Sequence, residues 1–107
     1  MFDRKQYLKQ WQIERYKKHP SFINWFAMLQ RCNNPNHNRY ASYGGRGIQV
    51  HPAWRVFKTY EKEFGYSKPG PGYTVDRIDN DGAYEPSNVQ WLTKAESTRK
   101  QNLQRMR

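Results

Sequence analysis

Three aspartates, Asp76, Asp79 and Asp81, lie close together in a chain whose formal net charge is +10. Carboxylate oxygens are hard ligands of the kind that Mg²⁺ prefers in proteins. We therefore expect Asp76 and Asp79 to be the candidate ligands of Mg²⁺ or another divalent metal if the protein is an enzyme. Asn88 belongs to the same stretch, TVDRIDNDGAYEPSNVQW, and Arg77 stands beside Asp76.

A calcium-binding EF-hand is the first alternative for this stretch. If Gly82 takes the sharp turn of such a loop, its first and twelfth positions should be Asp and Glu. The chain has Arg77 and Asn88 at those positions. The spacing therefore argues against an EF-hand.

A structural role for the same acids is an equally good interpretation. Aspartates in tight turns often accept hydrogen bonds from their own backbone, and DNDG is a strong turn sequence. Asp76 or Asp79 could also form a salt bridge with Arg77 or Arg46 and so fix the stretch to the preceding loop. The sequence leaves the metal site and the structural turn both open.

Histidine could supply a general base. His51 is the best candidate because it ends a β-like run at residues 48–50 and could lie near the aspartates, although a partly buried histidine beside Pro52 is the simpler interpretation. A zinc site built from Cys32, His37 and His51 is conceivable by count. It lacks the closely spaced ligand pair that is typical of zinc sites.

The segment YGGRG suggests a contact with phosphate. Its glycines let the backbone approach a ligand closely, so that Arg46 could reach a phosphate or a guanine edge. The alternative is a tight turn in which Arg46 pairs with the acidic stretch. The segment does not have the spacing of a nucleotide-binding P-loop.

Helical patterns predict the elements that position these residues. A helix is expected over residues 3–18, and Ser21 is expected to cap a second one. The predicted buried stripe of that second helix is Phe22, Trp25, Phe26 and Leu29. Residues 33–47 are rich in turn formers, and a further helix with an apolar face is expected over 52–64.

The acidic stretch lies between two predicted strands, 73–78 and 88–92. Thr93 followed by Glu96 forms a capping box that opens a basic helix over residues 94–105. The expected fold class is therefore α+β: a small, mainly helical domain with a β-hairpin and a ββα unit in its C-terminal half.

Length predicts one domain over residues 1–107. Within it we expect a basic helical arm at 1–20, a helix-loop-strand-helix core at 21–65 and the ββα unit at 73–105. The single cysteine of the chain excludes an internal disulfide. Since no run of about 18 apolar residues is present and the first residues lack an apolar segment, we expect neither membrane insertion nor secretion.

The charge indicates a nucleic-acid partner, because the chain has 19 Lys and Arg but only nine Asp and Glu. The excess of basic residues is concentrated at both ends of the chain. Double-stranded DNA is the expected partner. The side chains expected to contact it are Lys17, Lys18, Arg31, Arg46, Lys94, Arg99, Lys100 and Arg105.

The text from WFAMLQRCNNPN through YGGRGIQVHPAW to DRIDNDGAYEPSNVQWLTKAE, residues 25 to about 102, resembles a group of small phage proteins, the HNH or AP2-like endonucleases of the His-Me finger type. The resemblance implies an HNH-like ββα unit in a protein of the cytoplasm of an infected bacterium. By this resemblance Asp76 is the metal-ligand aspartate and Asn88 the asparagine that steadies the turn. Arg77 falls where the general-base histidine belongs.

The catalytic positions depart from the family pattern. A guanidinium cannot take a proton at neutral pH, and Ser97 or Thr98 near the third motif position is a weak metal ligand. The leading hypothesis is therefore a phage-type protein that binds the DNA backbone through basic helices and in which nuclease activity has been lost. The other hypotheses are an active metal-dependent HNH-type endonuclease that uses Asp76, Asn88 and His51, and a degenerate nuclease fold that binds a host protein or ribonucleoprotein.

Overall fold

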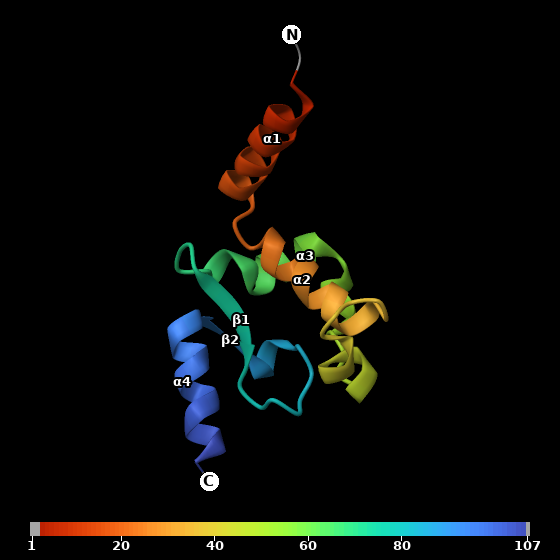
Figure 1. The fold of residues 1–107 in the computed structure, drawn as a ribbon, viewed down its shortest axis with the longest axis vertical. Helices are drawn as coiled ribbons and strands as arrows, with labels where there is room; N and C mark the ends of the chain where they lie inside the picture. The colour runs from red at the N-terminus through yellow and green to blue at the C-terminus, as the bar shows by residue number, and fades with distance from the viewer. Residues whose placement is uncertain (1–2, 107) are drawn as a thin grey trace.

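A computed structural model describes residues 3–106 as four α-helices and one two-stranded antiparallel sheet, joined by loops with short 3-10 turns. The elements are α1 (Arg4–Lys18), α2 (Phe22–Asn33), α3 (Phe57–Glu63), β1 (Tyr73–Arg77), β2 (Val89–Thr93) and α4 (Lys94–Arg105). The hairpin lies between α4 and α2, and α1 projects away from this body (Figure 1). A small α+β domain is therefore confirmed.

Helix α1 forms where the sequence predicts it. Asp3 caps it, since its carboxylate accepts a hydrogen bond of 2.9 Å from the backbone N–H of Lys5, and basic residues in the last turn complement the helix dipole. No residue of α1 is buried. The guanidinium of Arg15 lies 4.1 Å from the ring centroid of Trp11 and 4.2 Å from that of Phe22, which links α1 to the start of α2.

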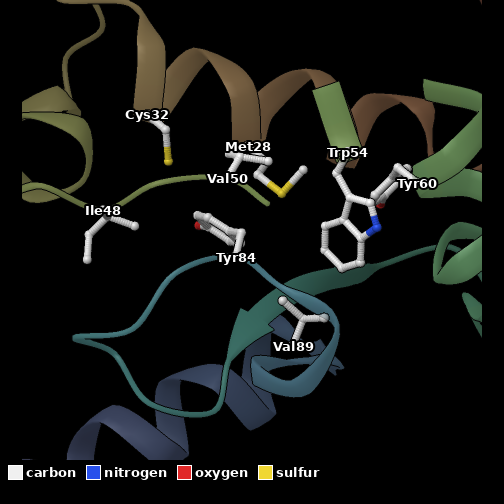
Figure 2. Packing of buried hydrophobic residues seen from close by; sticks show 8 residues of the cluster. All are labelled: Met28, Cys32, Ile48, Val50, Trp54, Tyr60, Tyr84 and Val89. Atoms are coloured by element: carbon white, nitrogen blue, oxygen red, sulfur yellow. The ribbon is translucent and has the colours of Figure 1, made fainter. Parts of the chain in front are cut away.

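The core lies between α2, the loop after it and the hairpin (Figure 2). The rings of Trp54 and Tyr60 are fully buried and meet edge to face at 5.5 Å. The buried hydrophobic residues are Met28, Cys32, Ile48, Val50, Trp54, Tyr60, Tyr84 and Val89. Large rings thus supply much of the buried area of a small domain.

The predicted buried stripe of α2 is partly wrong. Met28 and Cys32 are the buried residues, Trp25 and Leu29 pack against the core only in part, and Phe26 is 52% exposed. The helix carries apolar residues on more than one side, so spacing alone did not select the face that meets the hairpin. Ser21 does precede the helix but makes no capping hydrogen bond.

The buried position of Ser21 explains a neighbouring glycine. A Cβ atom on Gly65 would lie 2.3 Å from the Ser21 hydroxyl oxygen. The chain just after α3 can therefore pass Ser21 only because residue 65 has no side chain.

The segments predicted at 48–50 and 52–64 form with changes. Residues 48–50 are not a strand, because they make a single parallel bridge, Val50 with Tyr84. The second segment divides into a 3-10 turn, Pro52–Arg55, and α3, with Val56 extended between them. Trp54 and Tyr60 are buried and Phe57 and Phe64 pack against the core, so the segment does present an apolar face.

The hairpin and its capping box are confirmed. Strands β1 and β2 pair from Tyr73 with Thr93 to Arg77 with Val89. At the start of α4, the Thr93 hydroxyl accepts from the Glu96 N–H at 3.2 Å and the Glu96 carboxylate accepts from the Thr93 N–H at 2.9 Å. This places α4 directly after β2, where its side chains reach back to the hairpin.

Candidate nucleic-acid interface

Asn88 holds the turn between β1 and β2. Its side-chain oxygen accepts from the N–H of Asp79 at 2.8 Å, and its amide donates to the carbonyls of Asp79 at 3.1 Å and Ala83 at 2.9 Å. A Cβ atom on Gly82 would lie 2.7 Å from the Asn88 amide nitrogen. The turn closes around a buried asparagine, and a glycine is needed to let it do so.

Arg77 is buried under the same turn. Its guanidinium donates to the carbonyls of Asn80 and of Gly82, the second at 3.0 Å, and lies 5.1 and 5.2 Å from the ring centroids of Tyr43 and Tyr84. A guanidinium in these contacts stays charged and donates only. Arg77 therefore acts here as a fixed positive charge that supports the loop.

Asp76 and Asp79 do not have the partners predicted for them. The salt bridges proposed from Asp76 or Asp79 to Arg77 or Arg46 do not form. Instead Asp76 accepts from the ammonium of Lys100 at 2.9 Å and from the Gln90 amide at 3.1 Å. Sequence reasoning could not match Asp76 with Lys100, because α4 must first fold back onto β1.

The alternative prediction, that Arg46 pairs with the acidic stretch, is confirmed. Arg46 donates to the carboxylate of Asp81 at 2.7 Å and to the carbonyl of Asn80 at 2.8 Å. Asp79 accepts from the N–H of Asp81 at 2.9 Å, so it stabilises its own turn. The three aspartates therefore have different partners: Asp76 pairs with Lys100, Asp79 accepts from its own turn, and Asp81 pairs with Arg46.

The divalent-metal site predicted at Asp76 and Asp79 stays a prediction. No group of three or more His, Cys, Asp or Glu within residues 3–106 could hold a metal ion. The same holds for the zinc alternative, since Cys32 lies in the core, where burial raises the pKa of its thiol, and His37 accepts from the N–H of Arg39.

The contacts of His51 are with Trp54 and Tyr84. Its ring is edge-on to Trp54 at 5.8 Å, and its backbone N–H donates to the Tyr84 carbonyl at 2.7 Å. It is not among the described residues that line the cleft beside Asp76. The simpler interpretation of His51, a partly buried histidine beside Pro52, matches its position.

That cleft, of about 340 Å³, is the feature that joins the separate segments. It is lined by α2, the loop after it, β1, the hairpin turn and α4. Four arginines contribute to its lining against one aspartate: Arg31, Arg39, Arg46 and Arg77. Ser97 and Gln101 line it from α4. We call it the arginine cleft.

The predicted nucleic-acid residues divide into three groups. Arg31 and Arg46 line the arginine cleft. Lys100 does not present a free ammonium, since only 21% of its side chain is exposed and it is bonded to the hairpin. The remaining cations are exposed on α1 and α4, and they are Lys17, Lys18, Lys94, Arg99 and Arg105.

Sequence reasoning missed Arg39. It lies in the turn-rich loop after α2, and no periodicity marks a loop residue as facing a site. Its basic character and its place shortly before YGGRG were the only signals. The cleft forms because the loop returns against β1, which depends on the buried ring of Tyr84 and the bridge at Val50.

Comparisons of the chain with models of protein families, with curated proteins and with solved structures each found no match. Among residues 3–106, no helix combines the length and the apolar character needed to cross a bilayer.

Proposed function

We propose that the protein binds the backbone of double-stranded DNA through the arginine cleft and the basic helices around it, without cleaving the DNA. The observation that carries this proposal is the convergence of four arginines from separate segments on one cleft beside the hairpin. Arginine matches phosphate geometry with two parallel hydrogen bonds, and each phosphate that it neutralises releases counterions.

Two of the four arginines are available for this role. The side chains of Arg46 and Arg77 already donate to the hairpin turn. Among residues 3–106, the guanidinium groups of Arg31 and Arg39 make no hydrogen bond or salt bridge, although Arg31 lies 5.6 Å from the ring centroid of Tyr43. Arg31 and Arg39 would therefore contact phosphate directly. Arg77 would supply fixed positive charge, because its partners are neutral carbonyls, whereas the charge of Arg46 is balanced by Asp81.

The exposed cations of α1 and α4 would extend the contact on either side. Lys94, Arg99 and Arg105 are exposed on α4, which lines the cleft through Ser97 and Gln101, and Lys17 and Lys18 end α1. Surface charges of this kind steer a polyanion toward a site and add little sequence preference.

We also propose that the chain belongs with the small phage HNH or AP2-like proteins that its sequence resembles. The order of two strands and a helix, with Asp76 near the end of β1 and Asn88 just before β2, supports that proposal. Loss of cleavage is favoured by Arg77 in the base position and by the pairing of Asp76 with Lys100.

Two measurements on the wild-type chain test the function together. The affinity for a labelled DNA duplex is measured by fluorescence anisotropy in EDTA across a salt series, and a supercoiled plasmid is incubated with Mg²⁺ or Mn²⁺. We expect binding in EDTA with a steep salt dependence and no nicking. Affinity no better than that of an unrelated protein of equal charge would contradict the proposal. Nicking that is lost in Asp76→Ala would support the endonuclease alternative instead.

Binding of a host protein is a second candidate because α2 exposes large apolar side chains. Ile23 and Phe26 are 63% and 52% exposed, and they line a hollow together with Trp11 and Tyr16 of α1. Capture from a host lysate that has been treated with nuclease separates the two functions. A true protein partner is retained after the nucleic acid is removed.

A further inference from the structure

The ammonium of Lys100 lies in a group of three oxygens from the hairpin. Its nitrogen is 2.9 Å from a carboxylate oxygen of Asp76, 2.5 Å from the backbone carbonyl of Arg77 and 3.4 Å from the side-chain oxygen of Asn80. A carboxylate, a peptide carbonyl and an amide oxygen thus face one positive charge.

These oxygens are held in place by partners other than Lys100. The Gln90 amide donates to Asp76 at 3.1 Å, and the Asn80 amide donates to Gln104 at 2.7 Å, which turns the Asn80 oxygen toward Lys100. The Arg77 carbonyl is fixed by the pairing of β1 with β2. The oxygen group is therefore a built feature of the hairpin and α4.

Carboxylate, backbone carbonyl and asparagine oxygens are the donor set with which proteins coordinate Ca²⁺ and related hard cations, and water completes the coordination. An ammonium is a compact point charge with three donors, so it can satisfy the same three oxygens. We propose that Lys100 is a built-in cation that fills an oxygen site for a divalent ion. The wild-type chain then needs no divalent metal at this position.

The proposal deepens the proposed function, because it concerns the wall of the same cleft and rests on that function for its biological meaning. With Lys100 in place, the carboxylate of Asp76 is neutralised and does not repel a phosphate in the arginine cleft. On this arrangement the proposed DNA binding should not require a divalent ion, and should therefore persist in EDTA.

The test is to remove the built-in cation. In Lys100→Ala the three oxygens lose their positive partner, and the shortened side chain opens space for an ion and its waters. One carboxylate makes a weak site, so we expect saturation near about 10 mM Ca²⁺ and a melting temperature that rises by about 5 °C. The melting temperature is measured by circular dichroism in EDTA and in Ca²⁺ or Mn²⁺ at matched ionic strength.

Three controls make the result specific. We expect no response to Ca²⁺ in the wild type, in Lys94→Ala, which removes an exposed lysine from the same helix, or in the double variant Lys100→Ala with Asp76→Asn. If Lys100→Ala is unfolded in EDTA, Ca²⁺ should restore its helical signal, and Lys100→Ser is measured in the same way.

A folded Lys100→Ala that ignores Ca²⁺ and Mn²⁺ would overturn the proposal. An equal rise of the wild-type melting temperature with Ca²⁺ would also overturn it. If Lys100→Ala and Lys100→Ser are both unfolded in EDTA, the proposal is overturned when Ca²⁺ restores the helical signal of neither. These readouts do not involve DNA. Failure of the cation site and failure of DNA binding are therefore separate results.

Discussion

The ammonium of Lys100 lies 2.9 Å from the carboxylate of Asp76 and ties the last helix to the first strand of the hairpin. Their side chains are only 21% and 12% exposed. The pair therefore lies where water screens it weakly, so each charge relies on the other for its compensation. Helix α4 is therefore held against β1 in part through this contact.

Breaking this ion pair should destabilise the domain. Asp76→Ala leaves the Lys100 ammonium largely out of water without its carboxylate, so we expect the free energy of unfolding to fall by about 2 to 3 kcal/mol. Urea unfolding followed by circular dichroism measures the change. The matched control is Asp81→Ala, because its pair with Arg46 is 42% and 85% exposed and should be worth less than about 1 kcal/mol. Equal losses in the two variants would be inconsistent with this account.

Asn88 is expected to be the most sensitive polar residue of the turn. Asn88→Ala removes one accepted and two donated hydrogen bonds and takes from the Asp79 N–H and the Ala83 carbonyl the partner that Asn88 supplies. We predict a loss of about 2 to 3 kcal/mol in the free energy of unfolding. Asn102→Ala on the exposed side of α4 should change it by less than about 0.5 kcal/mol. A similar small change at Asn88 would show that the turn does not depend on that residue.

The capping box predicts a pH dependence with a definite sign. Hydrogen bonds from the backbone and then the side chain of Thr93 lower the pKa of Glu96 below its ordinary value of 4.5. The stabilisation is therefore fully present above pH 4.5 and is lost as the pH falls through the lowered pKa. Glu96→Gln should reduce the loss of stability on acidification. Thr93→Ala should cost about 1 kcal/mol at neutral pH.

Both measurements use urea unfolding at a series of pH values. Glu85→Gln, which changes an exposed carboxylate in the hairpin turn, is the control. If Glu96→Gln and the wild type lose stability in parallel as the pH falls, the capping box does not contribute as described.

The basic residues at the end of the projecting helix α1 should contribute to DNA affinity and not to the free energy of unfolding. Because no residue of α1 is buried, Lys17→Ala with Lys18→Ala should leave the free energy of unfolding within about 0.5 kcal/mol of the wild type. The same double change should weaken DNA binding and reduce the slope of log K against log salt by about 1 to 2. Anisotropy in a salt series measures the slope. An unchanged slope would remove α1 from the proposed interface.

The elements that sequence predicted well are those set by local chemistry. The two strands, the capping box of Thr93 with Glu96 and the helix that follows depend on neighbouring residues, and the structure places them within about one residue of the prediction. The outcome for α2 was poorer. Its apolar residues cover more than one side, so burial of Met28 and Cys32 rather than Phe26 was decided by the hairpin that packs on it.

The candidate site was predictable only in part for the same reason. Arg46 near the acidic stretch followed from charge and turn chemistry. The pairing of Lys100 with Asp76 and the contribution of Arg39 to the cleft join residues far apart in the chain. The hydrogen bond of 2.7 Å between His19 and the buried Glu61 is a further contact of this kind. Tertiary packing creates these contacts, and no local pattern encodes them.

The salt dependence of DNA affinity in the double variant Arg31→Ala with Arg39→Ala tests the central claim most directly. If these two arginines neutralise phosphates, the slope of log K against log salt should fall by about 2 relative to the wild type. The matched control, Arg55→Ala with Lys58→Ala, removes two exposed cations that do not line the cleft and should change the slope less. A double variant at Arg31 and Arg39 that keeps the wild-type slope and affinity would contradict the claim that the arginine cleft holds the DNA backbone.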